Sequence, residues 1–177
     1  LAQFEAALRS GNRTALAAQF ARECHFRDLL AFTWSITPWL GAEPIPQLLA
    51  TQQKDAQARG FAIAEGRTPP RRLQRAGFDV IEAIFRFETA VGRGFGVLRL
   101  LAGEPSRAFQ LMTSLHELAG FEERIGKRRP TGEAYSRNFG GTNWKEQRRA
   151  SSAYADREPV ALIVGGGQAG LSLAATM

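Results

Sequence analysis

The sequence predicts a mixed α+β domain in which helices come first and a curved antiparallel sheet follows. Apolar residues recur at helical spacing before residue 60, whereas beyond Pro69 and Pro70 they alternate with polar residues. Turn signals separate the alternating segments. Helices that precede a run of strands, rather than alternate with them, favour the α+β class.

Helical spacing predicts three helices in the first part of the chain. The first lies around residues 4–8 and ends at the breakers 10–12, and the second covers 14–20. The third covers 45–52, after Pro44, because proline is well suited to the first turn of a helix. These helices supply the apolar faces that the sheet needs as a partner.

A short strand is expected between the second and third helices, over residues 24–30. Its alternation places Cys24, Phe26, Asp28 and Leu30 on one face, so that Asp28 shares an apolar face. An aromatic loop that contains Trp34 and Trp39 follows. The carboxyl group of Asp28 is therefore the first candidate for chemistry in this chain.

Four further strands form an antiparallel meander over residues 71–77, 80–90, 94–101 and 107–118. In the second of them, apolar residues mostly face one way and charged residues the other, which predicts one packed face. Gly92, Gly94 and Gly96 predict a bulge or strong coiling. Such a sheet can curve around a helix or a pocket.

Residues 122–158 lose the hydrophobic period and read as a linker between residues 1–121 and the last segment. The linker carries nine Lys and Arg residues against six acidic residues, an excess of positive charge that could bind nucleic acid. The acidic residues are interleaved with the basic ones, which favours a solvated linker, and no nucleic-acid partner is predicted. Its aromatic residues predict partial packing on a neighbouring domain: Tyr135, Phe139, Trp144 and Tyr154.

Composition excludes several classes of protein. The chain has 177 residues with a formal net charge of +6, one cysteine and two histidines, which rules out a disulfide framework and a Cys/His zinc site. No metal site is expected. No apolar run approaches the roughly 18 to 20 residues of a membrane-spanning helix. No membrane partner is therefore predicted, and the cytoplasm is the expected compartment.

The most specific motif lies at the end, where five apolar residues over 160–164 precede Gly165, Gly166, Gly167 and Gly170. Gly165 would permit a tight turn, Gly167 would let a pyrophosphate approach the backbone, and Gly170 would let a helix pack close to the strand. No lysine follows the glycines, which excludes a nucleotide triphosphate P-loop. The motif predicts the start of a Rossmann domain over 159–177, an incomplete one, because a single βαβ unit takes about 30 residues.

The order of these features resembles two families. The front part, with the segments 24–28 and 41–45 and the late meander, resembles the NTF2-like (SnoaL-like) fold. The segment 135–144, joined to 160–175, is similar to the junction in bacterial flavin-containing monooxygenases that carry an NTF2-like N-terminal domain. The resemblance covers the whole chain.

The resemblance implies a flavoprotein oxidoreductase, of which this sequence would be a fragment inactive by itself. Gly165, Gly166, Gly167, Ala169 and Gly170 would then bind FAD, and a later motif would take NADPH. Reduced flavin would react with oxygen and oxygenate a bound small-molecule substrate. The NTF2-like domain would serve dimerisation, giving a homodimer, or substrate reception.

A second interpretation is a stand-alone NTF2-like domain that binds or isomerises a small molecule, with Asp28 as the general base. Burial could raise the pKa of this carboxyl toward the operating pH. The alternative for Asp28 is a structural role, either paired with an arginine or capping the loop that follows it. Trp34, Trp39, His25 and His116 could edge a pocket, but packing or exposure is the favoured explanation for them.

Overall fold

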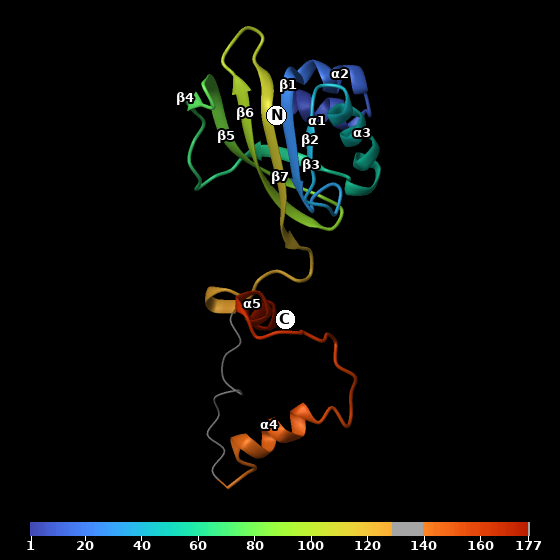
Figure 1. Ribbon diagram of the computed structural model, residues 1–177, viewed down its shortest axis with the longest axis vertical. Coiled ribbons are helices and arrows are strands. Elements are labelled where there is room, and N and C mark those ends of the chain that lie inside the picture. Colours follow the sequence, from blue (N-terminus) through green and yellow to red (C-terminus); the bar gives the residue numbers. More distant parts are fainter. Residues whose placement is uncertain (129–139, 177) are drawn as a thin grey trace. The chain divides into compact units, whose positions relative to one another are not determined.

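The computed structural model describes residues 1–128 and 140–176, and the chain divides into two compact units, Leu1–Glu122 and Glu123–Met177 (Figure 1). The first unit holds three helices and a curved sheet, which confirms the mixed α+β class. Two of the aromatic residues expected to dock the linker, Tyr135 and Phe139, lie outside the described residues.

The three predicted helices of the first unit are present as α1 (Ala2–Arg9), α2 (Arg13–Gln19) and α3 (Pro44–Ala56). The side chain of Asn12 caps α2 by accepting a hydrogen bond from the amide of Ala15 at 3.0 Å. Gln57 adopts a left-handed conformation with φ of +47° and ends α3. Capping residues therefore mark the start of α2 and the end of α3.

The sheet has seven strands in the order β2-β1-β7-β6-β5-β3, and β4 pairs with β5 beside β3. All four predicted meander strands form, as do two strands that the sequence pattern did not indicate, β2 and β3. The bounds are β1 (Phe20–Leu29), β2 (Pro38–Leu40), β3 (Arg59–Ile63), β4 (Arg71–Arg75), β5 (Phe78–Glu88), β6 (Gly92–Leu101) and β7 (Arg107–Leu118).

One pairing corrects the expectation of a purely antiparallel sheet. Strand β1 runs parallel to β7, with Phe26 opposite Leu111 and Asp28 opposite Thr113. Alternation along a strand reports which face is buried but not the direction of the neighbouring strand. The parallel pair joins β1 to the last strand of the meander and brings Asp28 beside Thr113.

The core lies between the helices and the inner face of the sheet, which is the face toward α1, α2 and α3 (Figure 1). Leu8, Leu16 and Leu49 of the helices are fully buried here. Aromatic rings fill the concave side: the rings of Phe61 and Phe87 stack at 5.2 Å. Further rings in or against this core are those of Phe4, Phe20, Phe26, Phe32, Trp39 and Phe85.

The glycines of β6 allow this aromatic packing. A Cβ at Gly96 would overlap the ring of Phe85 and would lie 2.5 Å from the carbonyl oxygen of Met112. A Cβ at Gly94 would lie 2.5 Å from Cζ of Phe87. The rings of β5 thus lie across the neighbouring strand, in space that only glycine leaves open.

In the second unit, α4 (Trp144–Ser152) and α5 (Gln168–Thr176) are the helices among the described residues, after a short 3-10 turn at Gly126–Arg128. Asn143 and Glu146 form a capping box at the start of α4. The lost hydrophobic period of residues 122–158 did not indicate this helix. The sequence carried the signal, because an asparagine three residues before a glutamate marks a helix start.

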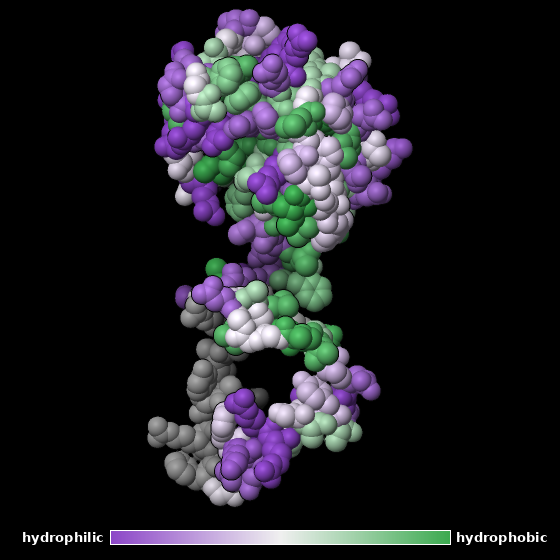
Figure 2. Space-filling view, viewed as in Figure 1, coloured by the Kyte–Doolittle hydropathy of each residue, from purple (hydrophilic) through white to green (hydrophobic). Residues whose placement is uncertain are grey.

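The predicted strand over 159–164 does not form. A strand satisfies its backbone groups through a neighbouring strand, and the described residues provide none here. Most apolar side chains of this segment stay exposed, by 95% at Val160 and 90% at Val164. Hydrophobic surface is visible in the part of the molecule that holds α5 (Figure 2).

Among the described residues, no helix combines the length and the apolar character that crossing a membrane requires.

Candidate functional site

Asp28 lies at the end of β1 with its side chain fully buried. Its Oδ1 accepts hydrogen bonds from the amide of Ala31 at 3.2 Å and from the hydroxyl of Thr113 at 2.7 Å. Its Oδ2 accepts from the amides of Phe32 and Thr33, at 2.9 and 2.8 Å, and from the Thr33 hydroxyl at 2.9 Å. Five donors therefore converge on one carboxylate.

This geometry favours the loop-capping alternative for Asp28. Three of the donors are backbone amides of the loop after β1, which would otherwise be buried without a partner. The fourth residue, Thr113, joins the cap to β7 and depends on the parallel pairing of the two strands. A carboxylate surrounded by donors and shielded from solvent has no free face toward a substrate in this conformation.

The capped loop has an unusual backbone. Leu30 and Trp34 adopt left-handed backbone conformations, with φ of +67° and +52°, which residues other than glycine rarely adopt. Trp34 is 61% exposed, whereas Trp39 is partly buried and stacks on Phe26 at 5.7 Å, against the core. The two tryptophans considered as pocket residues thus have different environments, and neither lines the groove described next.

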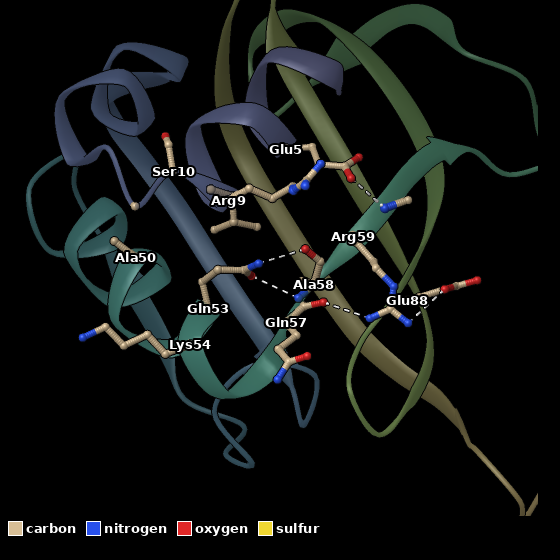
Figure 3. Close-up of a pocket in the computed structure, with 13 residues that line it drawn as sticks. Glu5, Arg9, Ser10, Ala50, Gln53, Lys54, Gln57, Ala58, Arg59 and Glu88 are labelled. Carbon is tan, nitrogen blue, oxygen red and sulfur yellow. Dashed lines mark hydrogen bonds and ion pairs between the residues drawn. The ribbon is translucent and has the colours of Figure 1, made fainter.

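An open groove of about 740 Å3 lies between α1, the end of α3 and the start of β3 (Figure 3). The partly exposed Ala50 contributes to its apolar part, whereas Leu8 and Ala58 in its lining are fully buried. Gln53 organises one wall, because its side-chain amide donates to the carbonyl of Ala58 at 2.9 Å and accepts from the Ala58 amide at 3.1 Å. The groove is thus built where α1 meets the consecutive elements α3 and β3, which are distant from α1 in sequence.

The charged groups of the groove differ in how they are used. Glu5 accepts from the amides of Gly60 and Phe61 at 2.9 and 3.0 Å, and Arg59 pairs with Glu88 at 3.4 Å. In Figure 3, Arg9 extends along the groove toward Glu5, whereas Lys54 points away. With both carboxylates engaged, the guanidinium of Arg9 is the cation best placed to meet a ligand.

Sequence reasoning did not single out this groove. Arg9 and Gln53 read as ordinary polar helix residues, and β3 was not expected. The only local signal is Gln53, a polar residue near the end of α3 whose side chain hydrogen-bonds the backbone of Ala58 just beyond the helix. Which elements meet at the groove is decided by tertiary packing.

The histidines and the cysteine have simple environments. The ring of His25 lies edge-on to Phe109 at 5.7 Å, and that of His116 edge-on to Phe95 at 5.1 Å. Burial raises the pKa of the Cys24 thiol, which makes it a poor nucleophile. No group of His, Cys, Asp or Glu within the part of the chain that the structure describes is arranged to hold a metal ion.

The predicted cofactor-binding residues lie at the turn before α5. Gly165 has a φ of +107°, a conformation suited to glycine, and a Cβ at Gly170 would overlap the carbonyl oxygen of Gly165. A Cβ at Gly166 or Gly167 would meet nothing within 4 Å, so the backbone there is open to approach. Ala169, in the first turn of α5, is exposed.

This turn fits two requirements of a dinucleotide fingerprint. The first glycine makes a turn that other residues resist, and the last allows helix and turn to approach closely. The amides at the start of α5 could then receive a phosphate. The binding of FAD or NADPH stays a prediction.

No protein family model matches the sequence, and no curated protein matches it. Among solved structures, a DUF4783 family protein from Bacteroides uniformis is 11% identical, with 66% of this chain and 96% of that chain covered and a TM-score of 0.47. A domain of unknown function with a cystatin-like fold from Nostoc punctiforme is 12% identical, with 87% and 89% covered and a TM-score of 0.47.

An NTF2-like protein of unknown function from Cytophaga hutchinsonii is 9% identical, with 65% and 85% covered and a TM-score of 0.41. Likeness at this level carries no conclusion about activity, ligand or partner. The structural neighbours are thus NTF2-like and cystatin-like proteins of unknown function, and none of the comparisons supports a flavin monooxygenase. The mixed α+β architecture rests on the topology described above.

Proposed function

We propose that residues 1–122 form an NTF2-like domain that binds a small molecule with an acidic group. The observation that carries this proposal is the groove at α1, α3 and β3, whose volume lies in the range of small-molecule sites. Its apolar part and the guanidinium of Arg9 suit a ligand with a short apolar body and a carboxylate. The concave side of the sheet is filled by the aromatic core and therefore serves packing.

A titration followed by two-dimensional NMR tests the proposal on the whole chain. Hexanoate should shift the amide signals of Ala58, Arg59 and Gly60, whereas the uncharged hexanamide should shift them less. Arg9→Gln should abolish the hexanoate effect, because it removes the cation and keeps the polarity. Arg13→Gln, at the exposed start of α2, is the matched control and should bind as the parent chain does.

Shifts that persist in Arg9→Gln, or that fall on residues outside the groove, would contradict the proposal. A panel of other small carboxylic acids and phosphates, tried in the same way, extends the test to other ligand shapes.

An isomerase that uses Asp28 as its base would act at a different place, because Asp28 does not line the groove. It would require the loop over residues 31–33 to release the carboxylate, because both oxygens already accept hydrogen bonds. Asp28→Asn tests it directly. If the variant binds ligand as the parent chain does but no longer isomerises it, Asp28 acts as a general base. If the variant loses only stability, Asp28 acts as the loop cap.

The turn before α5 favours a second candidate function, the start of a dinucleotide site in a flavin- and NADPH-dependent oxidoreductase. The support is the geometry of Gly165 and Gly170. In this interpretation the first unit would act as an accessory module for substrate reception or homodimer formation. Light scattering of the chain at rising concentration tests the dimer, and a constant monomer mass would exclude it.

A further inference from the structure

A cluster of arginines surrounds one carboxylate on the outer face of the sheet, which is the face opposite the helices. Glu82 of β5 pairs with Arg71 of β4 at 3.0 Å and with Arg99 of β6 at 2.7 Å. Arg75 of β4 lies 3.6 Å from the same carboxylate. Glu82 and these three arginines are called the arginine cluster.

The cluster carries an excess of positive charge. Three guanidinium groups share one carboxylate, so two positive charges are not neutralised within it. The side chains of Arg71 and Arg75 are 51% and 46% exposed, whereas that of Glu82 is only 11% exposed. Each guanidinium has five N–H donors, and the contacts with Glu82 leave several of them directed to solvent.

Arg99 of β6 holds the cluster in place through two hydrogen-bond partners. Arg99 bonds Gln110 at 2.5 Å in addition to Glu82, and the hydrogen bond from Arg99 holds the pKa of Glu82 below its ordinary value. Glu82 therefore stays charged at neutral pH and keeps the guanidinium groups together against their mutual repulsion. Groups that are already positioned lose less entropy when a ligand binds.

The surroundings add another cation and an aromatic face. Arg107 of β7 lies opposite Leu101, and Leu101 lies opposite Val80, which is two residues from Glu82 on the same face. Phe78, opposite Arg75 in the β4 pairing, is 45% exposed, and its ring packs on Phe109 at 4.9 Å. Cations beside an exposed ring suit a phosphorylated molecule with a planar part.

We propose that the arginine cluster binds the phosphate group of a small phosphorylated molecule, at a site separate from the groove. A phosphate offers several oxygens to the planar forks of Arg71 and Arg75, a match that a single lysine ammonium does not provide. Two copies of this face would repel each other through their excess charge, which favours an anionic ligand over self-association here.

Calorimetric titration of the whole chain with inorganic pyrophosphate at low salt tests this proposal. Binding should weaken as salt rises, and Arg75→Gln should weaken it about tenfold, because one charge-assisted interaction is lost. Arg93→Gln is the matched control, since Arg93 is also an exposed arginine of the sheet but pairs with Glu117 at 2.5 Å. It should bind pyrophosphate as the parent chain does.

Equal weakening in both variants would show a general charge effect and would overturn the proposal, as would the absence of binding at low salt. Titration with ADP identifies the ligand further. If ADP binds more tightly than pyrophosphate and Phe78→Ala removes the difference, the site also takes the planar part; if the two bind equally, it takes phosphate alone. Arg13→Gln, at the exposed start of α2 and outside both sites, should leave both titrations unchanged.

Discussion

At the scale of single residues, Asp28 links sequence, loop conformation and stability. Its carboxylate satisfies amides that would otherwise be buried without partners, and it holds a loop in which Leu30 and Trp34 have strained conformations. The sequence placed Asp28 on the buried face of its strand, as observed. The sequence alone does not distinguish a general base from a loop cap at Asp28. The hydrogen-bond donors come from a loop and from Thr113, which is 85 residues away in the chain.

We expect Asp28→Ala to destabilise the first unit by more than about 3 kcal/mol, because several buried donors lose their acceptor together. Asp28→Asn should cost less, since one amide oxygen still accepts. Thr113→Val removes a single donor and should cost about 1 kcal/mol. Urea denaturation of the three variants measures the order, and an Asp28→Ala chain as stable as the parent would refute the cap.

Gly96 gives a second prediction at this scale. Gly96→Ala should destabilise the first unit by about 3 kcal/mol or more, because the new Cβ meets the Met112 carbonyl oxygen and the ring of Phe85. Gly103→Ala is the control, since a Cβ there meets nothing within 4 Å, and its stability should change by less than about 0.5 kcal/mol. Thermal unfolding compares the two, and equal midpoints would contradict the packing described.

At the scale of elements, sequence patterns located those that are stabilised locally. The three helices and the meander strands follow from apolar spacing and turn residues. Strands β2 and β3 did not, and their formation depends on pairing with β1 and β5. The segment 159–164 shows the converse, since a strong apolar pattern forms no strand without a partner.

Helix α4 depends on its cap, since it has no buried residues. Asn143→Ala should therefore lower the helix content of Trp144–Ser152, at a cost of about 1 kcal/mol in the helix, and leave the unfolding of the first unit unchanged. Asn143→Asp keeps the acceptor and serves as the control. Carbon chemical shifts of α4 measure its helix content; equal shifts in both variants would argue against the capping box.

At the scale of the whole molecule, the charge network of the outer face makes stability depend on pH. The hydrogen bond from Arg99, together with Arg71 and Arg75, lowers the pKa of Glu82 below its ordinary value of 4.5. A carboxyl with a depressed pKa in the folded state contributes stability above the pKa of the unfolded chain. That contribution is lost as the pH falls from about 4.5 through the lower folded value.

The parent chain should accordingly lose stability as the pH falls below about 4.5, and Glu82→Gln should show a shallower loss over the same range. Urea midpoints measured at pH values from neutral to acid test this. Asp79, whose pKa is lowered by Arg72, adds to the loss in both chains and cancels in the comparison. Parallel curves for the two chains would show that the cluster does not act through Glu82.

The sequence by itself determined the class of the first unit, the positions of its helices and long strands, and which residues face the core, because these depend on local periodicity and turn chemistry. Tertiary structure alone decided the parallel pairing of β1 with β7, the donors around Asp28, the groove at Arg9 and the arginines around Glu82. Each joins residues far apart in the chain, and the pattern along one strand does not record which strand lies beside it.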